Sequence, residues 1–227
     1  MKCFSAIVTT AVAICATSAF SQGFINLDFE NAVVTPVSGN PGRVVASDAA
    51  PGWAAYIGGN AQSAIGYDTV GLGGAAVFLE DTNASSFGGP LPFQGAYGIL
   101  LEGSTAGQPT AASIGQTGQV PLDAISVTFL LSLNSNVQLT FAGQNIPLIQ
   151  IGSTSNYQIL AGDISAFSGQ TGQLFFIANP GTTLTAGGGL IDDIQFSSTV
   201  IPEPAESALG AIGAIVFGFY RVRNFRR

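Results

Sequence analysis

The chain has 227 residues, of which six are basic, thirteen are acidic and none is histidine. Most of the basic residues lie at the two ends, so residues 22–200 hold one cation, Arg43, against eleven acids, a formal charge of −10. A surface of this charge repels nucleic acid, because phosphate contacts need Lys and Arg. Without His, Lys or Cys between the ends, Ser–His and Cys–His catalytic systems are excluded, and the usual transition-metal ligand is missing.

Residues 1–21 have the features of a secretory signal peptide. A lysine at position 2 precedes an apolar run at 6–16, and small residues at 19 and 21 fit cleavage before residue 22. An uncleaved anchor is the alternative, but the apolar run is too short to span a bilayer well. Both cysteines, Cys3 and Cys15, lie in this segment, so the mature chain is expected to contain no disulfide.

Residues 22–200 repeatedly alternate apolar and polar side chains, which is typical of strands with one buried face. The clearest run is 125–133, and a second run at 137–141 follows the turn-forming Asn134-Ser135-Asn136, which predicts a hairpin. Further strands are expected at Phe24–Phe29, Ala75–Glu80, Tyr97–Glu102, Leu148–Ile151, Gln158–Leu160, Leu174–Ala178 and Leu190–Phe196. About nine short strands, separated by Gly, Asn, Ser and Pro, predict one all-β domain, a sandwich or barrel.

Three short motifs mark the two ends and an early loop of this domain. They are Asn26–Glu30, Pro51–Trp53 and Leu190–Phe196. These motifs resemble the ends of galactose-binding-like jelly rolls, a fold that many carbohydrate-binding modules share. The resemblance implies a jelly-roll-like β sandwich with a carbohydrate-binding-like role. Because one fold hosts many functions, the role itself has to be argued from a site.

The last 27 residues, 201–227, contain three features in a fixed order. Pro202-Glu203-Pro204 comes first, and an uncharged apolar stretch, Ala208–Tyr220, follows it. A basic cluster ends the chain, formed by Arg221, Arg223, Arg226 and Arg227. As a helix the apolar stretch would rise only about 20 Å, short of the roughly 30 Å hydrocarbon core, so it would be a marginal permanent anchor. The arginines predict a cytoplasmic C-terminus.

This tail resembles the PEP-CTERM sorting signal of Gram-negative bacteria, which has the same three parts in the same order. In that family a membrane cysteine protease, an exosortase, is thought to process the protein near Pro-Glu-Pro, and the product goes to the cell surface or the extracellular polymer matrix. The resemblance implies that Pro202, Glu203 and Pro204 are recognition residues and that the membrane anchor is transient. Ile201 stands where Val is more usual, and Gly162–Thr171 resembles a segment of PEP-CTERM ectodomains. A plain tail anchor is the alternative.

Glu30 and Asp192 are candidates for a structural calcium site. They lie in the first and last predicted strands, which are close together in such jelly rolls. Asp192 shares the strand parity of Ile194, which predicts a side chain pointing to the core, where a carboxylate is costly unless it is paired or metal-bound. Ca²⁺ prefers carboxylate and carbonyl oxygens, and modules of this resemblance often hold calcium at these places. The alternative is that Asp192 accepts backbone N–H groups at a strand end.

Aromatic residues supply the candidates for ligand stacking. Trp53, the only tryptophan, follows a Pro-Gly turn. If exposed, its ring could stack on a sugar, but packing in the core is the favoured interpretation. Weaker stacking candidates are Tyr56, Tyr67, Tyr97 and Tyr157. The acids at the ends of predicted strands, Glu80, Asp81 and Glu102, are expected to be solvated.

These features favour an exported, non-catalytic protein of the cell surface or extracellular matrix. An exosortase would sort it, and the domain would contact exopolysaccharide or neighbouring surface proteins. The second hypothesis is a structural subunit that self-associates through sheet edges or Gly-rich loops. The third and least favoured is a carboxylate-based glycan hydrolase, for which no spacing of acids in the sequence argues.

Overall fold

The computed structural model describes residues 23–69, 71–83, 91–105, 109–181 and 187–201, and these fold almost entirely as β-structure. The predicted signal peptide lies outside the described residues. So does nearly all of the predicted sorting signal, with Pro202, Glu203, Pro204 and the four C-terminal arginines. Both signals therefore stay predictions. Within the described segments, no helix is long and apolar enough to cross a membrane.

Fifteen strands and two short helical turns make up the described segments. In chain order they are β1 (Pro36–Val37), β2 (Asn40–Val45), α1 (Ala46–Ala49), β3 (Ala54–Ile57), β4 (Asn60–Gln62), β5 (Ala64–Tyr67), β6 (Ala76–Asp81), β7 (Tyr97–Glu102), β8 (Ala112–Gln119), β9 (Ser126–Ser132), β10 (Gln138–Phe141), β11 (Gln144–Ile146), β12 (Leu148–Ser153), β13 (Tyr157–Asp163), η1 (Ser165–Phe167), β14 (Thr171–Ala178) and β15 (Gly188–Ser197).

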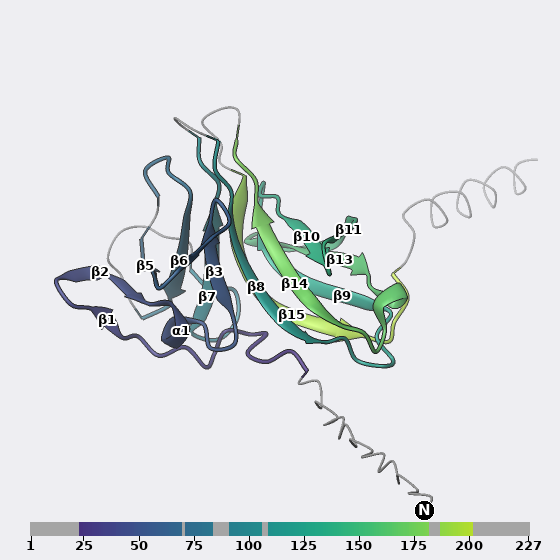
Figure 1. Ribbon diagram of the computed structural model, residues 1–227. Coiled ribbons are helices and arrows are strands. Elements are labelled where there is room, and N and C mark those ends of the chain that lie inside the picture. The colour runs from purple at the N-terminus through teal and green to yellow at the C-terminus, as the bar shows by residue number, and fades with distance from the viewer. Residues whose placement is uncertain (1–22, 70, 84–90, 106–108, 182–186, 202–227) are drawn as a thin grey trace, which may run out of the picture.

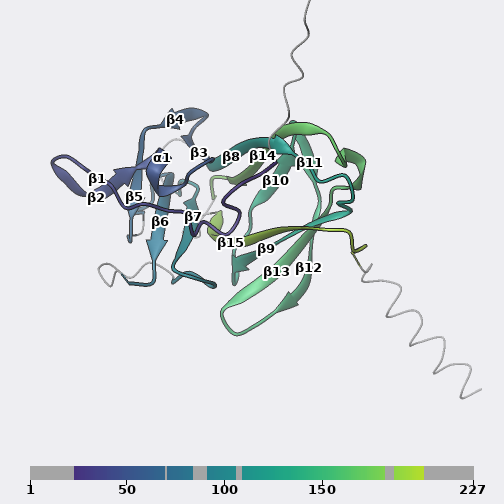
Figure 2. The ribbon, with the colours of Figure 1, turned by 90° about the horizontal axis from the view of Figure 1, so that it is seen from below.

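The strands form two sheets that pack face to face. One has nine strands in the order β1-β2-β5-β6-β7-β15-β9-β13-β12, and the other has six in the order β11-β10-β14-β8-β3-β4. Among the described pairs, β5 and β6 are parallel and the rest are antiparallel. Figure 1 shows β3, β8, β14 and β10 of the six-stranded sheet side by side, and Figure 2 shows the nine-stranded sheet as a separate layer. The expected all-β class and two-sheet sandwich are confirmed.

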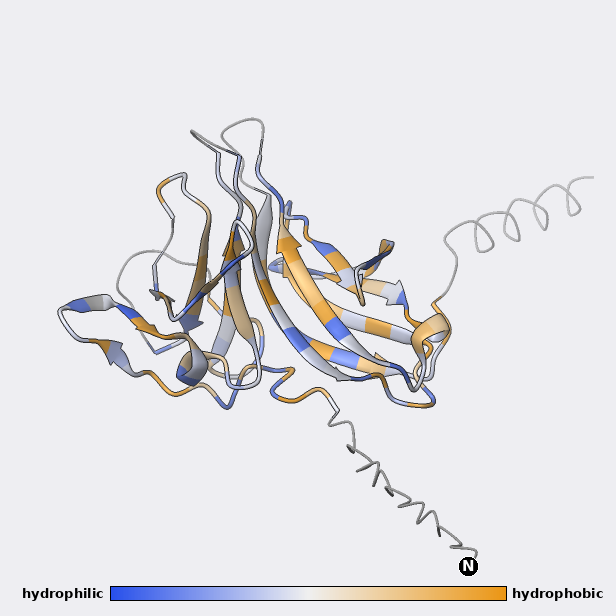
Figure 3. Ribbon diagram, in the orientation of Figure 1, coloured by the Kyte–Doolittle hydropathy of each residue, from blue (hydrophilic) through white to orange (hydrophobic). Residues whose placement is uncertain are grey.

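The core lies between the sheets and follows from period-two alternation. Val127, Phe129 and Leu131 on β9 are fully buried and belong to one cluster with Leu174 and Phe176 of β14. In Figure 3, β9 changes between apolar and polar residues along its length, whereas the second half of β14 is continuously apolar. All the described strands lie between residues 36 and 197, so a fragment of residues 22–200 carries both sheets and the whole core.

The predicted hairpin of residues 125–133 with 137–141 is wrong. Both runs are strands, β9 and β10, but β9 pairs with β13 and β15, whereas β10 pairs with β11 and β14 in the other sheet. Leu131 and Leu139 are both fully buried in the same cluster. The two strands therefore face each other across the core, and the Asn134–Asn136 turn crosses from one sheet to the other.

The sequence located eight of the strands to within three residues and misjudged one segment. Phe24–Phe29 is not a strand, because Asn26 and Phe29 have φ values of 50° and 60°, which bend the chain. Phe29 is nevertheless fully buried. Strands β1 to β5, β8 and β11 were not expected, and most of them are short or rich in Gly and Ala.

The outer face of the nine-stranded sheet carries a second, smaller apolar cluster. It contains Phe78, Leu100 and Leu190, with Phe93 packed against them. Phe93 lies in residues 91–97, which lead into β7, and its ring centroid is 5.1 Å from that of Tyr157. This part of the outer face is therefore covered, and side chains beneath it are buried although they point away from the main core.

Candidate functional site

Asp192 is buried as expected, but it faces the opposite side of its strand. Strand β15 contains a bulge, in which Asp192 pairs with Leu130 and Gln195 pairs with Thr128, while Asp193 has a φ of 47°. The extra residue reverses the parity between Asp192 and Ile194. The sequence prediction that Asp192 points to the main core with Ile194 is therefore wrong, and its side chain lies on the outer face beside Leu130.

The buried Asp192 carboxylate is satisfied by backbone donors. Its Oδ2 accepts the N–H groups of Phe93 and Gln94, each at 2.9 Å, and its Oδ1 accepts that of Asp193 at 2.7 Å. Burial raises the pKa of Asp192 to about 6, and these three hydrogen bonds oppose that rise. Asp192 therefore accepts N–H groups, as the alternative interpretation of the sequence held, and it does so from a segment about a hundred residues away.

Glu30 binds the same segment at its other end. Its Oε1 accepts the N–H groups of Ala96 and Tyr97, both at 2.9 Å. Gly95 has a φ of 62°, and a Cβ on it would lie 2.2 Å from Oε1 of Glu30, so only glycine lets the carboxylate approach. Glu30 and Asp192 are thus two clamps on residues 93–97 rather than partners of each other.

The calcium hypothesis for Glu30 and Asp192 stays a prediction. Across the segments that the structure describes, no group of three or more His, Cys, Asp and Glu side chains is arranged to hold a metal ion. The two carboxylates have backbone donors in place of a cation, which explains their positions without a metal.

Trp53 is a core residue, as the favoured interpretation of the sequence held. It is 5% exposed, and its indole N–H donates to the carbonyl oxygen of Asn26 at 2.9 Å. Its ring packs against Phe29 and Phe176, with centroids 5.7 and 6.1 Å away. Because the ring is buried and packed against these two residues, Trp53 offers no surface for sugar stacking.

Three of the four tyrosines proposed for stacking are also engaged. The hydroxyl of Tyr67 donates to Asp81 at 2.8 Å, and burial, then this bond, raises the pKa of Tyr67. Burial also raises the pKa of Tyr97. Tyr157 packs against Phe93. Tyr56 alone among the four lies on the six-stranded sheet.

Tyr56 and Phe175 form an aromatic pair on the outer face of that sheet. Phe175 on β14 is opposite Gly115 on β8, and a Cβ on Gly115 would lie 2.5 Å from the Phe175 ring. The ring therefore lies flat across the glycine and reaches toward Tyr56 on β3, with centroids 5.4 Å apart. Both side chains are half-buried. We call this pair the aromatic platform.

Uncharged polar side chains lie beside the aromatic platform, together with Ile177 and Ala54. Ser113 is opposite both Tyr56 and Ile177, and Thr117 is opposite Gln173 on the next row of the same face. An aromatic plane with hydroxyl and amide groups beside it suits a ligand that has both apolar faces and hydroxyl groups. Sugars have this combination. The platform could not be predicted from the sequence, because residues 174–178 are apolar at every position and their pattern does not indicate that Phe175 faces outward.

The molecule also has a cavity, which differs from the aromatic platform in its lining. It is a cavity of about 300 Å³ beside β2, β5 and β6, lined by residues that include Arg43, Ile65 and Phe78. The guanidinium of Arg43 donates to the carbonyl oxygen of Ala64. Its lining is mainly apolar, with Arg43, Gln62 and Thr69 as its polar side chains, and it contains no pair of stacked aromatic rings.

No protein-family model and no curated protein sequence matches this chain. Among solved structures, the enzymatically active domain of tailspike protein 4 of bacteriophage CBA120 is similar at 16% identity and a TM-score of 0.35, over 65% of this chain and 19% of its own. A family 11 carbohydrate-binding module from Clostridium thermocellum, in complex with a β-1,3-1,4-mixed-linked tetrasaccharide, is similar at 12% identity and a TM-score of 0.33, over 64% and 88%. The chain thus spans about a fifth of the tailspike domain. At these TM-scores, neither likeness supports an argument about function.

Proposed function

We propose that this is an exported, non-catalytic protein of the cell surface or extracellular matrix, which contacts polysaccharide through the aromatic platform. The observation that carries the proposal is the half-buried Tyr56–Phe175 pair, fixed on a sheet face among uncharged polar side chains. The jelly-roll-like assignment and sorting by an exosortase complete the proposal, and both rest on the sequence motifs. The absence of histidine from the chain supports a non-catalytic role.

The charge of the domain indicates which polysaccharide it would contact. With one cation against eleven acids in residues 22–200, an anionic polymer would be repelled over most of the surface. The aromatic platform itself carries no charge. We therefore propose a neutral glycan, bound by stacking of sugar rings on Tyr56 and Phe175 and by hydrogen bonds to the neighbouring hydroxyl and amide groups.

The platform is suited to weak binding with a small cost in conformational entropy. Tyr56 and Phe175 lie on strands that both pair with β8, and each ring has few torsions to fix, so little conformational entropy is lost on binding. A single aromatic pair supplies roughly 0.5–1.5 kcal/mol per stacked ring, which is modest. Many copies displayed along one matrix polymer would bind more strongly together than one copy alone.

Affinity electrophoresis in gels containing the host's own extracellular polysaccharide tests the proposal. We expect Tyr56→Ala or Phe175→Ala to weaken retardation about 3–10-fold, which corresponds to the stacking energy of one ring. Tyr157→Ala is the matched control, since it removes a half-buried tyrosine from the other sheet. Equal retardation of all three variants and the parent chain would contradict the proposal.

A structural role is the second candidate, and one sheet edge favours it. Strand β12 is an outermost strand of the described nine-stranded sheet, contains no charged residue, and has Ile151 45% exposed. Edge strands without charge offer unpaired backbone groups to a second chain. If copies pair through β12, light scattering will show concentration-dependent association that Ile151→Lys abolishes. A monomer at all concentrations would remove this candidate.

A further inference from the structure

Glu80 is a buried acid without a partner. It is 1% exposed, and neither carboxylate oxygen has a hydrogen-bond partner in the structure. On β6, Glu80 lies opposite Gly98 and next to Phe78 on the same outer face. The Leu190 side chain covers Gly98, since a Cβ added to this glycine would lie 3.1 Å from it. The sequence expectation that Glu80 is solvated at a strand end is therefore wrong, because the outer face is covered here.

The neighbouring acids are satisfied, which sets Glu80 apart. Asp81 accepts the Tyr67 hydroxyl at 2.8 Å and the N–H of Asn83 at 2.7 Å. Glu102 is half-buried and accepts the N–H of Gly71 at 2.7 Å, and burial raises its pKa. Only the Glu80 carboxylate has both oxygens available among the buried side chains of the described segments.

A second buried acid stands beside Glu80. The parallel register of β5 and β6 pairs Tyr67 with Leu79, and the N–H of Asp68 then donates to the carbonyl oxygen of Leu79 at 2.9 Å. Asp68, which is 5% exposed, is thereby placed next to Glu80. Burial raises the pKa of Glu80 to about 8, and the charges of Asp68 and then Glu102 add to that rise.

No positively charged side chain of the domain is available to neutralise these two acids. Arg43 is the one basic residue between positions 22 and 200, and its guanidinium donates to the carbonyl oxygen of Ala64. A buried carboxylate needs a proton, a donor or a counter-ion. Both oxygens of Glu80 are without a hydrogen-bond partner, so the compensation for Glu80 must come from solution, as a proton or as a cation.

We propose that Asp68 and Glu80 bind a divalent cation of the calcium class. Two carboxylates neutralise its charge, and hard oxygen ligands are those that calcium prefers. Calcium takes six to eight oxygens, so most of its shell would be water and main-chain carbonyl groups, which suits the fact that no three acids in the described segments are arranged as a metal site. Sites of this kind in extracellular modules bind at about 10⁻⁴–10⁻³ M. These two residues are distinct from Glu30 and Asp192, which accept backbone N–H groups of residues 93–97.

Thermal unfolding of the purified chain, with excess calcium chloride or with a chelator, tests this proposal. We expect calcium to raise the melting temperature by about 3–6 °C, as mass action predicts for a weak site near saturation. Glu80→Gln and Asp68→Asn should each abolish that rise. Asparagine tolerates the φ of 44° at position 68, so this variant should fold.

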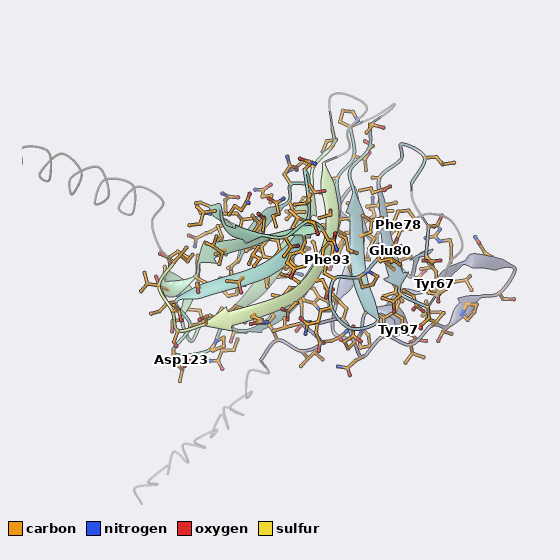
Figure 4. All side chains as sticks on the ribbon, turned by 180° about the vertical axis from the view of Figure 1, so that it is seen from behind. Tyr67, Phe78, Glu80, Phe93, Tyr97 and Asp123 are labelled. Atoms are coloured by element: carbon orange, nitrogen blue, oxygen red, sulfur yellow. The ribbon has the colours of Figure 1, made fainter. Side chains whose placement is uncertain are left out.

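Two control variants make the outcome decisive. Asp123→Asn removes an exposed acid at the far end of the molecule from Glu80 (Figure 4) and should keep the full calcium response. Asp192→Asn tests the site expected from the sequence. No response of the parent chain, confirmed by titration calorimetry with calcium alone, would overturn the proposal. A response that Glu80→Gln retains and Asp192→Asn loses would also overturn it and would assign calcium to Asp192.

Discussion

At the scale of single residues, Asp192 holds a segment that lies about a hundred residues away in the chain. Its carboxylate supplies acceptors for three N–H groups, two of them from Phe93 and Gln94. Removing all acceptors leaves these donors without partners under the covering segment. Since each buried unsatisfied group costs about 1–3 kcal/mol, we expect Asp192→Ala to lower the free energy of unfolding by roughly 3 kcal/mol.

Urea denaturation measures this loss of stability, and Asp192→Asn should show an intermediate loss. The asparagine amide oxygen can still accept from Phe93 and Gln94, so its loss should be clearly smaller than that of alanine. Asp193→Asn is the control, because within the described segments the Asp193 side chain accepts from the Gln195 amide alone, so this variant should change stability by about 0.5 kcal/mol or less. Equal stability of Asp192→Ala and the parent chain would mean that the carboxylate does not hold residues 93–97.

The pH dependence of stability reports on Glu80. Its pKa of about 8 in the folded chain lies above the ordinary value of 4.5, so folding favours the protonated form. The stability from this group is complete below about pH 4.5 and is lost as the pH rises through about 8. Asp192 has the same sign over a lower window, from 3.8 to about 6.

Glu80→Gln isolates the contribution of this one group. In chelator, so that no cation competes with the proton, the variant should exceed the parent chain in stability by about 1–3 kcal/mol above pH 8 and lose that advantage at pH 5. Chemical denaturation at a series of pH values gives the difference curve. Parallel curves for the two chains would show that Glu80 titrates normally.

Single residues also show where prediction from the sequence ends. The burial of Trp53 was the favoured interpretation, since the residue follows a Pro-Gly turn, and the structure agrees. The orientation of Asp192 could not follow, because the bulge depends on the positive φ of Asp193 and on donors about a hundred residues away. The isolation of Glu80 was equally hidden, since nothing local shows that Phe93 and Leu190 cover the outer face.

At the scale of elements, the aromatic platform depends on the glycine in the middle of β8. Gly115→Ala would place a Cβ 2.5 Å from the Phe175 ring, so the ring has to move away from Tyr56. We expect this variant to fold normally and yet to lose polysaccharide retardation to the same degree as Phe175→Ala. Gly74→Ala is the matched control, because a Cβ there meets nothing within 4 Å. Full retardation of Gly115→Ala would show that ring placement is unimportant.

Strands were predictable where alternation is strong and were missed where a polar residue faces inward. Strand β8 is an example: Gln116 takes an inward position, and its amide both accepts from the N–H of Ile25 at 2.6 Å and donates to its carbonyl oxygen at 2.9 Å. The pairing of β9 and β10 was misjudged for another reason. A short turn between two strands fits a hairpin and a sheet-to-sheet crossing alike, and only the packing of Leu131 against the other sheet decides between them.

At the scale of the whole molecule, charge and apolar surface are separated. Four of the eleven acids of residues 22–200 lie on or next to β5, β6 and β7, namely Asp68, Glu80, Asp81 and Glu102, whereas the strands of the other sheet, which holds the aromatic platform, contain no charged residue. Glycan binding and cation binding are therefore assigned to different faces. Each can fail a test without affecting the other, and the proposed sorting signals at the two ends would deliver both to the same place.

The most direct measurement is an equilibrium binding isotherm of residues 22–200 on the host's purified extracellular polysaccharide. We predict saturable binding by the parent fragment that resists added salt, because the platform is uncharged, and loss of most of that binding in the Tyr56→Ala, Phe175→Ala double variant. Circular dichroism and melting temperature would confirm that the double variant is folded. Equal binding by both fragments, or none by either, would contradict the proposed role of the aromatic platform.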